Sequence, residues 1–195
     1  MWVSFVGGIM KILFIDTHLF DINIMLFEDY KIIAEKHIVG EKHNSKYLLP
    51  AIQSVCNGTI YDQIIVINGP GSFTGVRLGV TVAKTLAYCQ QIPIKSISIL
   101  DLMNLSCDGN PHIFGISDGN GYFIGEYNDH KRLKEFYYLS NYEYQDFINK
   151  HKVETDVAIN YENVLKFIEG LPEENPHSIN PIYIKLIGVE NVKKN

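Results

Sequence analysis

The sequence predicts an α/β fold of two lobes, and three features lead to this prediction. First, Gln63–Ile67 is a short, continuous run of mostly β-branched apolar residues, which is typical of a strand buried on both faces. Second, a glycine-rich stretch and an Ala/Leu-rich run follow it directly, as a loop and a helix do in a parallel α/β unit. Third, the polar turn cluster at residues 107–111 separates this part from a second group of strands.

The first lobe, residues 10–106, is predicted to begin with three strands. Alternating and apolar runs place them at Lys11–Asp16, 23–28 and 31–39, with the third antiparallel. A helix follows at Ser45–Cys56, with Leu48, Ile52 and Val55 on one face. Next we expect the strand Gln63–Ile67, a helix at about 76–89, a strand at 93–97 and a helix at 98–105. Three antiparallel strands, helix, strand, helix, strand is a ribonuclease-H-like order.

The second, smaller lobe is predicted to span residues 107–195. A hairpin of strands at His112–Ser117 and 122–127 is expected around the turn 118–121, whose glycines can adopt positive φ. A strand at 135–139, a helix at 142–150, a strand at 156–159 and a helix at 162–170 follow. Residues 172–181 are rich in Pro, Asn and Glu and are expected to form a surface loop.

Composition points to a protein of the reducing cytoplasm. With 195 residues, 46% of them hydrophobic, the chain can bury about 70% of its unfolded surface. Three widely spaced cysteines without a C-x-x-C pair argue against a disulfide framework and a zinc knuckle. Residues 1–9 lack the basic opening of a signal peptide and are interpreted as a leader or upstream start; no run approaches a membrane span. The net charge of −5, without a basic stripe, disfavours RNA binding by this chain alone.

Two interpretations of the glycine loop stay open from its residues alone. Gly69, Gly71 and Gly75 allow a sharp turn, and Ser72 or Thr74 can cap the following helix. Such a helix start could hold an anion, or the loop could be a tight, capped turn without a ligand. The glycine spacing does not fit the dinucleotide motif, and no Lys-Ser or Lys-Thr follows as a Walker A loop requires.

Catalytic and metal-binding signals are weak. No two of the seven histidines stand four residues apart, so the helical pair that grips a metal is missing. Ser72 or Thr74 would need a base such as His43 or His112 to act as a nucleophile, and no spacing predicts that contact, so Ser72 is interpreted as a cap. Asp16 follows the first strand and is interpreted as an acceptor for backbone N–H groups of the next turn rather than as a phosphate-site carboxylate.

The whole stretch around the loop resembles the signature of the TsaB (YeaZ) family. It reads Gly69-Pro70-Gly71-Ser72-Phe73-Thr74-Gly75-Val76-Arg77-Leu78-Gly79, and Ala83-Lys84 and Leu86-Ala87 follow. Flanking matches are Asp16-Thr17, Ser45 with Leu48-Leu49-Pro50, and Tyr183-Ile184-Lys185. The resemblance covers most of residues 10–100 and only fragments beyond. It implies the two-lobed fold of the actin-like ATPase superfamily.

The resemblance also implies a function. Proteins of this family are non-catalytic subunits of the machinery that installs threonylcarbamoyl on the adenosine next to the tRNA anticodon. They pair with TsaD, and the ATPase TsaE and the tRNA dock on the larger complex. ATP, the threonylcarbamoyl-adenylate and metal are then handled by the partners, so no catalytic residue, cofactor or metal is expected in this chain. A homodimer is the expected alternative when TsaD is absent.

The predicted partner surface lies on the two helices of the first lobe. Gly79, Ala83 and Ala87 recur every four residues and form a small-residue stripe, which another helix could approach closely. The same stripe could equally pack against the protein's own sheet. The residues assigned to the interface are Leu48, Leu49, Ile52, Val76, Gly79, Val80, Ala83 and Ala87. On this assignment Ala83→Arg is expected to abolish the complex and leave the fold intact.

Departures from the family concern mainly the second lobe, which is abbreviated. Relatives carry Asp-Ala-Arg where this chain has Asp118-Gly119-Asn120, and the order of His43-Asn44 is reversed.

Two other classes of protein stay open as alternatives. An actin-like ATPase or sugar-kinase relative would bind ATP on its own, whereas a glycoprotease-like peptidase, the less favoured class, would need a nucleophile such as Ser72.

Overall fold

The computed structural model describes residues 9–40 and 45–184. The expectations for residues 1–8, for His43-Asn44 and for Lys185 lie outside this part of the chain. Within the described residues, none of the helices has the length and apolar character that a membrane span requires.

The first sheet, built from the five strands of the first lobe, has a ribonuclease-H-like topology. Its strand order is β3-β2-β1-β4-β5, in which β2 is antiparallel to β1 and β3, and β1, β4 and β5 are parallel. The register pairs Phe14 with Met25 on one side and with Ile65 on the other. The strands are β1 Lys11–Asp16, β2 Ile22–Glu28, β3 Lys31–Ile38, β4 Gln63–Ile67 and β5 Ile94–Ile97.

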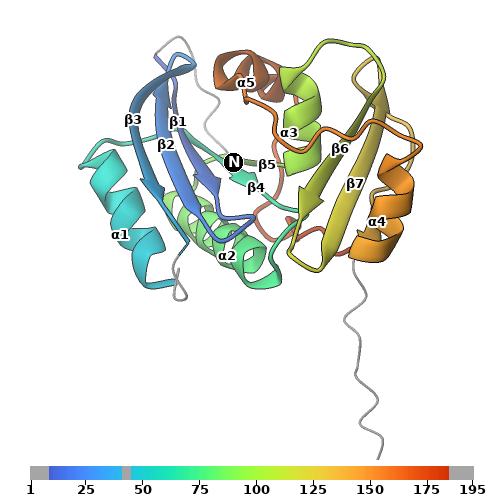
Figure 1. Cartoon of the computed structure of the whole chain (residues 1–195). Coiled ribbons are helices and arrows are strands. Elements are labelled where there is room, and N and C mark those ends of the chain that lie inside the picture. Colours follow the sequence, from blue (N-terminus) through green and yellow to red (C-terminus); the bar gives the residue numbers. More distant parts are fainter. Residues whose placement is uncertain (1–8, 41–44, 185–195) are drawn as a thin grey trace, which may run out of the picture.

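Two cores lie on the two faces of this sheet. Helices α1 (Ser45–Cys56) and α2 (Phe73–Gln90) cover its outer face, as Figure 1 shows. Along β1, Leu13 and Ile15 pack toward these helices, whereas Ile12 and Phe14 pack toward the second lobe. Because successive side chains of a strand point to opposite faces, a continuous apolar run is needed here, and Gln63–Ile67 meets the same need in β4.

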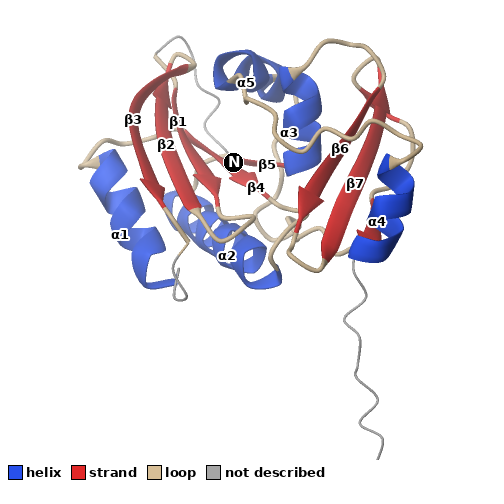
Figure 2. Cartoon of the chain, in the orientation of Figure 1, coloured by secondary structure: helices blue, strands red, loops and turns tan. Residues whose placement is uncertain are grey.

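The second sheet stands opposite the first, with helices between them. In this sheet β6, β8 and β9 each pair antiparallel with β7. Its strands are β6 His112–Ser117, β7 Gly121–Asn128, β8 Lys131–Arg132 and β9 Tyr137–Ser140. Figure 2 shows α3 (Ile99–Ser106) and α5 (Tyr161–Glu169) between the sheets and α4 (Asn141–Ile148) on the far face of the second sheet. The core between the sheets is continuous across both lobes.

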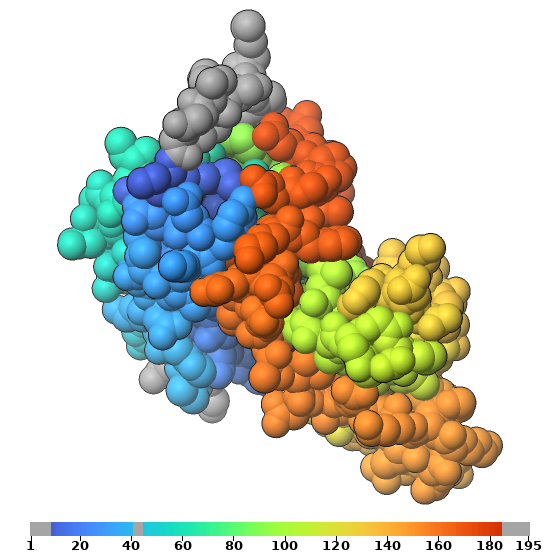
Figure 3. All heavy atoms as spheres, turned by 90° about the horizontal axis from the view of Figure 1, so that it is seen from above, coloured from blue at the N-terminus to red at the C-terminus, as the bar shows by residue number. Residues whose placement is uncertain are grey.

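The last part of the chain returns to the first lobe. Glu174 pairs with Ile94 of β5, and Ile182 N–H donates to Asn68 O (2.8 Å). Lys95 is only 4% exposed, and its ammonium donates to Ile168 O (3.1 Å) and Glu169 O (2.7 Å) at the end of α5. In Figure 3 the orange residues lie over the seam between the blue first lobe and the green and yellow second lobe. The predicted boundary between the two lobes at residue 107 stays a prediction. Residues 174–184 lie beyond that boundary in the sequence but pack on the first lobe.

Two predicted elements differ from the structure, and one observed strand was not predicted. Helix α2 begins at Phe73 and not at 76, because Ser72 caps it and brings Gly75 into the first turn. Residues 156–159 do not form the predicted strand; Val157 and Ile159 instead pack as half-buried side chains against the core between the lobes. The short strand β8 was not predicted, because two residues are too few to show a periodic pattern.

His112 links three segments of the second lobe. Its Nε2 lies 2.8 Å from Asp108 Oδ1, and its Nδ1 lies 2.8 Å from Glu154 Oε1. The hydrogen bond to Asp108 raises the pKa of His112; burial opposes this, and the contact with Glu154 adds to it. A histidine pKa that is higher in the folded than in the unfolded state contributes stability at low pH, which is lost as pH rises through the folded pKa.

Replacing His112 with glutamine should therefore destabilise the protein more at about pH 6 than at about pH 8.5, since an unfolded histidine titrates near 6.5. Urea unfolding of both proteins at the two pH values measures this difference. His177→Gln, which removes an exposed imidazole, serves as the control. Its effect on the free energy of unfolding is expected to differ less between the two pH values. An effect of His112→Gln that grows with pH would contradict the assigned direction.

Candidate functional site

The glycine loop connects β4 to α2 and lies against the turn that follows β1. Gly69 has φ of +109°, and the Gly69–Pro70 peptide is cis. Ser72 N–H donates to His18 O (2.6 Å), and Ser72 Oγ accepts from Gly75 N–H (3.3 Å). Ser72 is therefore the helix cap, as the sequence predicts.

The glycines allow the loop and helix to approach the backbone of residues 17–19. A Cβ on Gly71 would lie 2.0 Å from His18 O, and one on Gly75 would lie 2.2 Å from Thr17 O. A Cβ on Gly79 would lie 2.3 Å from Thr17 Oγ1, which itself donates to Gly75 O (2.7 Å). These contacts explain the three glycines by packing, without a bound anion.

Asp16 is buried and serves the same turn. Its Oδ1 accepts from the backbone N–H of His18 (3.0 Å) and lies 2.6 Å from His18 Nδ1. Burial by itself raises the pKa of the Asp16 carboxyl, but the charge and hydrogen bonds of His18 outweigh it, so the net pKa is lowered. Burial, and then the Asp16 charge, raise the pKa of Tyr161 to about 12. The interpretation of Asp16 as an acceptor for the turn is confirmed.

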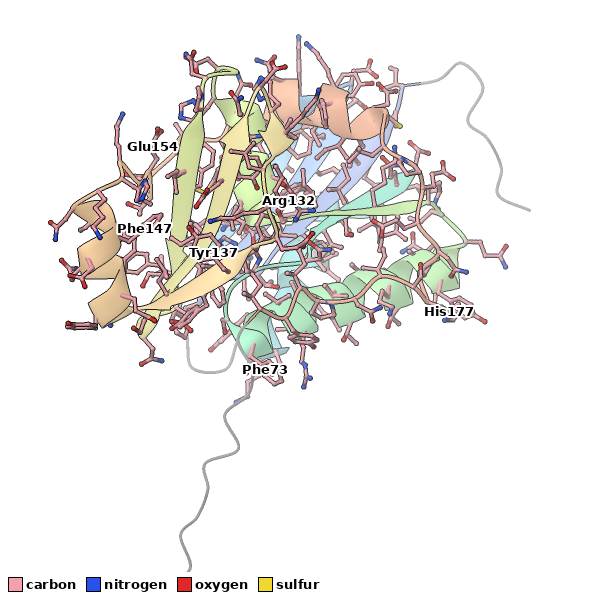
Figure 4. The ribbon with its side chains drawn as sticks, turned by 90° about the vertical axis from the view of Figure 1, so that its right-hand side faces the viewer. Phe73, Arg132, Tyr137, Phe147, Glu154 and His177 are labelled. Atoms are coloured by element: carbon pink, nitrogen blue, oxygen red, sulfur yellow. The ribbon has the colours of Figure 1, made fainter. Side chains whose placement is uncertain are left out.

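Arg77, Phe73 and Tyr183 form an exposed cluster at the start of α2. The Arg77 guanidinium lies 3.7 Å from the centre of the Phe73 ring, and its Nε donates to Tyr183 Oη (2.7 Å). Figure 4 shows Phe73 at the lower edge of the molecule. A guanidinium stacked on an aromatic ring is worth about 0.5–1 kcal/mol at an exposed site. The cluster therefore fixes the C-terminal segment against α2, while Thr74 is exposed beside it.

The residues predicted to contact a partner are mostly buried within the chain. Gly79, Ala83 and Ala87 face the protein's own sheet, and the Ala83 side chain is 0% exposed. Four more of them are also buried: Leu48, Ile52, Val76 and Val80. Of the eight predicted contact residues, only Leu49 is exposed, at 48%. The expectation that Ala83→Arg leaves the fold intact is wrong, because the new charge would enter a core without space for it.

A different set of side chains gives α2 an apolar flank. Leu78, Val82 and Leu86 recur every four residues and are half-buried against the core of the first lobe. Lys84 lies outside this set, and its ammonium donates to Ile179 O (2.7 Å) in the returning C-terminal segment. We call Leu49, Leu78, Val82 and Leu86 the helix flank.

The described residues provide little for catalysis. No group of three His, Cys, Asp or Glu side chains within residues 9–40 and 45–184 is placed to hold a metal ion. His112 is held by Asp108 and Glu154 in the second lobe, and His43 lies outside the described residues. The hydroxyl of Ser72 is used as the helix cap.

Ser72→Ala should reduce the free energy of unfolding by about 1 kcal/mol, because a helix donor then loses its partner. Ser72→Asp should retain most of the stability, since a carboxylate also caps a helix and interacts favourably with its N-terminus. Urea unfolding of the three proteins measures this order. Equal stability of wild type and Ser72→Ala would show that the cap contributes nothing.

Sequence reasoning assigned no role at this site to three residues, although Thr17 and Tyr183 were noted as family matches. His18 O accepts from Ser72 N–H, Thr17 Oγ1 donates to Gly75 O, and Tyr183 Oη accepts from Arg77 Nε. The signal that could have pointed to Thr17 and His18 is their position directly after a buried strand. Tyr183 lies more than a hundred residues from Arg77, and no local pattern connects them.

The loop, the sheet order and the two opposed sheets define a two-lobed protein of the ribonuclease-H-like, actin-like ATPase fold. A family model described as "TsaD: tRNA N6-adenosine threonylcarbamoyltransferase" matches residues 37–136, just over half of the chain. The chain therefore belongs to the family that this model describes, on its TsaB (YeaZ) side.

Two relatives agree with this assignment, and a solved structure has the same fold. The tRNA threonylcarbamoyladenosine biosynthesis protein TsaB of Bacillus subtilis is 40% identical over 99 residues, 48% of this chain and 43% of that protein. TsaB of Escherichia coli is 33% identical over 99 residues, 48% of this chain and 42% of that protein. These matches thus span less than half of either relative. YeaZ from Pseudomonas aeruginosa shares the fold, with a TM-score of 0.69 at 15% identity over 90% of this chain and 100% of that one.

Proposed function

We propose that this chain is a non-catalytic subunit in the biosynthesis of tRNA threonylcarbamoyladenosine, working in the cytoplasm as the partner of TsaD. The observation that carries the proposal is the helix flank, an apolar surface on the two helices that the family resemblance assigns to pairing. Leu49 on α1 is half-exposed, and Leu78, Val82 and Leu86 run along α2. Apolar side chains at a four-residue spacing fit against a helix of a partner.

The charge of the chain supports a partner that supplies the contacts to tRNA. The net charge is −5, which repels the phosphate backbone. In the proposed assembly TsaD provides the catalytic site, TsaE joins the larger complex, and tRNA binds to the whole. This chain then contributes stability and surface to TsaD, and forms a homodimer through the helix flank when TsaD is absent.

Size-exclusion chromatography with light scattering tests the proposal. The chain alone and the chain mixed with its cognate TsaD are compared at micromolar concentrations. A new 1:1 complex is expected, replacing any homodimer. Absence of a complex would overturn the proposal.

A second measurement separates this function from that of an ATPase. An ATPase of this fold would bind ATP unaided, and a ligand that binds only the folded state raises the melting temperature. We expect the melting temperature of the isolated chain to be the same with and without Mg-ATP. A rise that saturates with ATP concentration would favour the ATPase class.

A further inference from the structure

The sequence contains the dipeptide Asn-Gly three times, and the structure holds each copy differently. The copies are Asn57-Gly58, Asn68-Gly69 and Asn120-Gly121. An asparagine before glycine can lose its side-chain amide without a catalyst, because glycine has no Cβ to keep its backbone nitrogen away from that side chain. Since the reacting dipeptide is the same in all three copies, the surrounding structure decides which of them reacts.

Asn57-Gly58 follows the end of α1, which lies on the outer side of the first lobe (Figure 1). Both residues are exposed, and a Cβ on Gly58 would meet no atom within 4 Å. They occupy the centre of a turn in which Thr59 N–H donates to Cys56 O (2.7 Å), with φ of 42° and 80°. The Gly58 N–H and the Asn57 side chain form no hydrogen bond with residues 9–40 or 45–184. No contact therefore holds the two reacting groups apart.

Asn120-Gly121 lies at the start of β7, where the glycine is fixed. Gly121 N–H donates to Asp118 Oδ1 (3.1 Å), and Gly121 pairs with Ser140 of β9. Asn120 O accepts from Asn141 N–H (3.3 Å), so the peptide group between the two residues is held as well. The Gly121 nitrogen can therefore attack the neighbouring side chain only after these contacts open.

Asn68-Gly69 joins β4 to the glycine loop and is held on both sides. Asn68 Nδ2 donates to Ser96 Oγ (3.1 Å), and Asn68 N–H donates to Ile97 O (3.1 Å). Gly69 is buried, and its carbonyl oxygen accepts from Ile99 N–H (2.9 Å). The side chain and the glycine that would have to meet are thus fixed by separate contacts.

We propose that Asn57 is a modification site, at which the folded chain converts its own asparagine to aspartate or isoaspartate in water without an enzyme. The Gly58 nitrogen attacks Asn57 Cγ and loses its proton to water. The bond from Cγ to Nδ2 then breaks, and Nδ2 takes up a proton and leaves as ammonia. Water adds to one of the two carbonyls of the resulting succinimide ring and opens it. One ammonia is lost and one water is gained, so an uncharged amide becomes a carboxylate.

The product changes the end of α1 in charge and in backbone length. The new carboxylate follows the C-terminal end of the helix, which carries roughly half a negative charge, so their interaction is unfavourable. In the isoaspartate form the main chain runs through the former side chain and gains one methylene group. Asn57 has a positive φ, which is common for the residue that ends a helix, so both changes act on the helix end. We therefore expect the modified chain to have a lower melting temperature. The proposal does not depend on the pairing with TsaD.

Peptide mapping of the full chain by mass spectrometry tests this site. The folded chain is kept below its melting temperature in mildly alkaline water enriched in the heavy oxygen isotope, and the three Asn-Gly peptides are followed with time. Asn57 should gain a carboxylate that contains the heavy isotope about tenfold faster than Asn68 or Asn120, whose surroundings must first open. In the chain unfolded by urea, the three sites should react at similar rates.

Two variants connect the reaction to the named residue. Asn57→Gly removes the reactive amide and places a residue that adopts positive φ readily, so this variant should fold and show no modification at position 57. Asn120→Ser changes the exposed asparagine of another copy and is the matched control, which should leave the rate at Asn57 unchanged. Thermal unfolding verifies that both variants fold.

Two outcomes would overturn the proposal. One is a rate at Asn57 no higher than that at Asn120 in the folded chain, because the free turn would then give no advantage over a paired strand. The other is an order of rates that persists in urea, since the flanking sequence and not the structure would then determine it.

Discussion

Gly75→Ala is expected to destabilise the protein by about 3 kcal/mol, because overpacking a tight contact typically costs 1–3 kcal/mol and at times more. The new Cβ would lie 2.2 Å from Thr17 O and 2.7 Å from Leu19 O. Both atoms belong to the backbone, so relief requires a shift of α2 or of the turn after β1. In a helix without such contacts the same change would stabilise by about 1 kcal/mol, since alanine is the better helix former. The sign of the effect therefore reports the close packing directly.

Urea unfolding measures the effect of Gly75→Ala, with Gly170→Ala as the matched control. A Cβ on Gly170 would meet Phe167 O at 3.4 Å, an ordinary contact, and the backbone φ is −71°. The control is expected to change the stability by less than about 0.5 kcal/mol, as surface substitutions usually do. An unchanged or stabilised Gly75→Ala protein would show that the helix does not press against residues 17–19.

Val82→Arg is expected to remove the proposed complex with TsaD while the chain stays folded. Val82 is half-buried in the middle of the helix flank, so arginine can place its charge in solvent in the free chain. In the complex that charge would be enclosed by the partner without a counter-ion. Enclosing an unpaired charge costs several kcal/mol, which corresponds to an affinity loss of about a hundredfold or more.

Two further variants make this test specific. Gln145→Arg adds the same charge at an exposed position of α4 in the second lobe and should leave the complex intact. Ala83→Arg, one residue along the helix from Val82, should instead unfold the chain, because Ala83 is 0% exposed. Chromatography with light scattering and far-ultraviolet circular dichroism distinguish the two defects. A Val82→Arg chain that pairs normally with TsaD would contradict the assigned surface.

The strands of the first lobe could be predicted closely from the sequence. Lys11–Asp16 and Gln63–Ile67 have the predicted bounds, since both strands are buried on both faces and need an uninterrupted apolar run. The cap at Ser72 could be predicted as well, because its chemistry is local. The start of α2 was placed three residues late because the glycines that follow the cap look like loop residues, although Gly75 lies in the first turn of the helix.

The side of α2 that meets the sheet could not be predicted with the same accuracy. Periodicity shows which residues of a helix share a face, but it does not show whether that face meets the chain's own sheet or another protein. The small-residue stripe of Gly79, Ala83 and Ala87 meets the sheet, and the larger side chains of Leu78 and Val82 lie on the flank. Separating these cases requires the position of the sheet, which depends on pairings between distant strands.

A cavity of about 280 Å³ between the lobes, beyond the ends of β4 and β5, left no trace in the sequence. Asn68, Asn104 and Arg132 lie on separate elements and share no motif or spacing. Single polar residues at element ends are common, and only their meeting around one space distinguishes them. Such a cavity becomes visible once both sheets and the helices between them have been placed.

The return of the C-terminal segment to the first sheet has a consequence for how this protein can change in evolution. The chain leaves the first lobe after α3 and contacts it again at the end of α5, where Lys95 donates to Ile168 O and Glu169 O, and at Glu174, which pairs with Ile94. The second sheet therefore lies in a long segment whose two ends are held by the first lobe. Residues can be gained or lost around α4, on the far side of that sheet, without breaking a pairing of the first sheet. Such a topology tolerates changes in the length of the second lobe, whereas a residue inserted into the glycine loop would disturb the close contacts between α2 and residues 17–19.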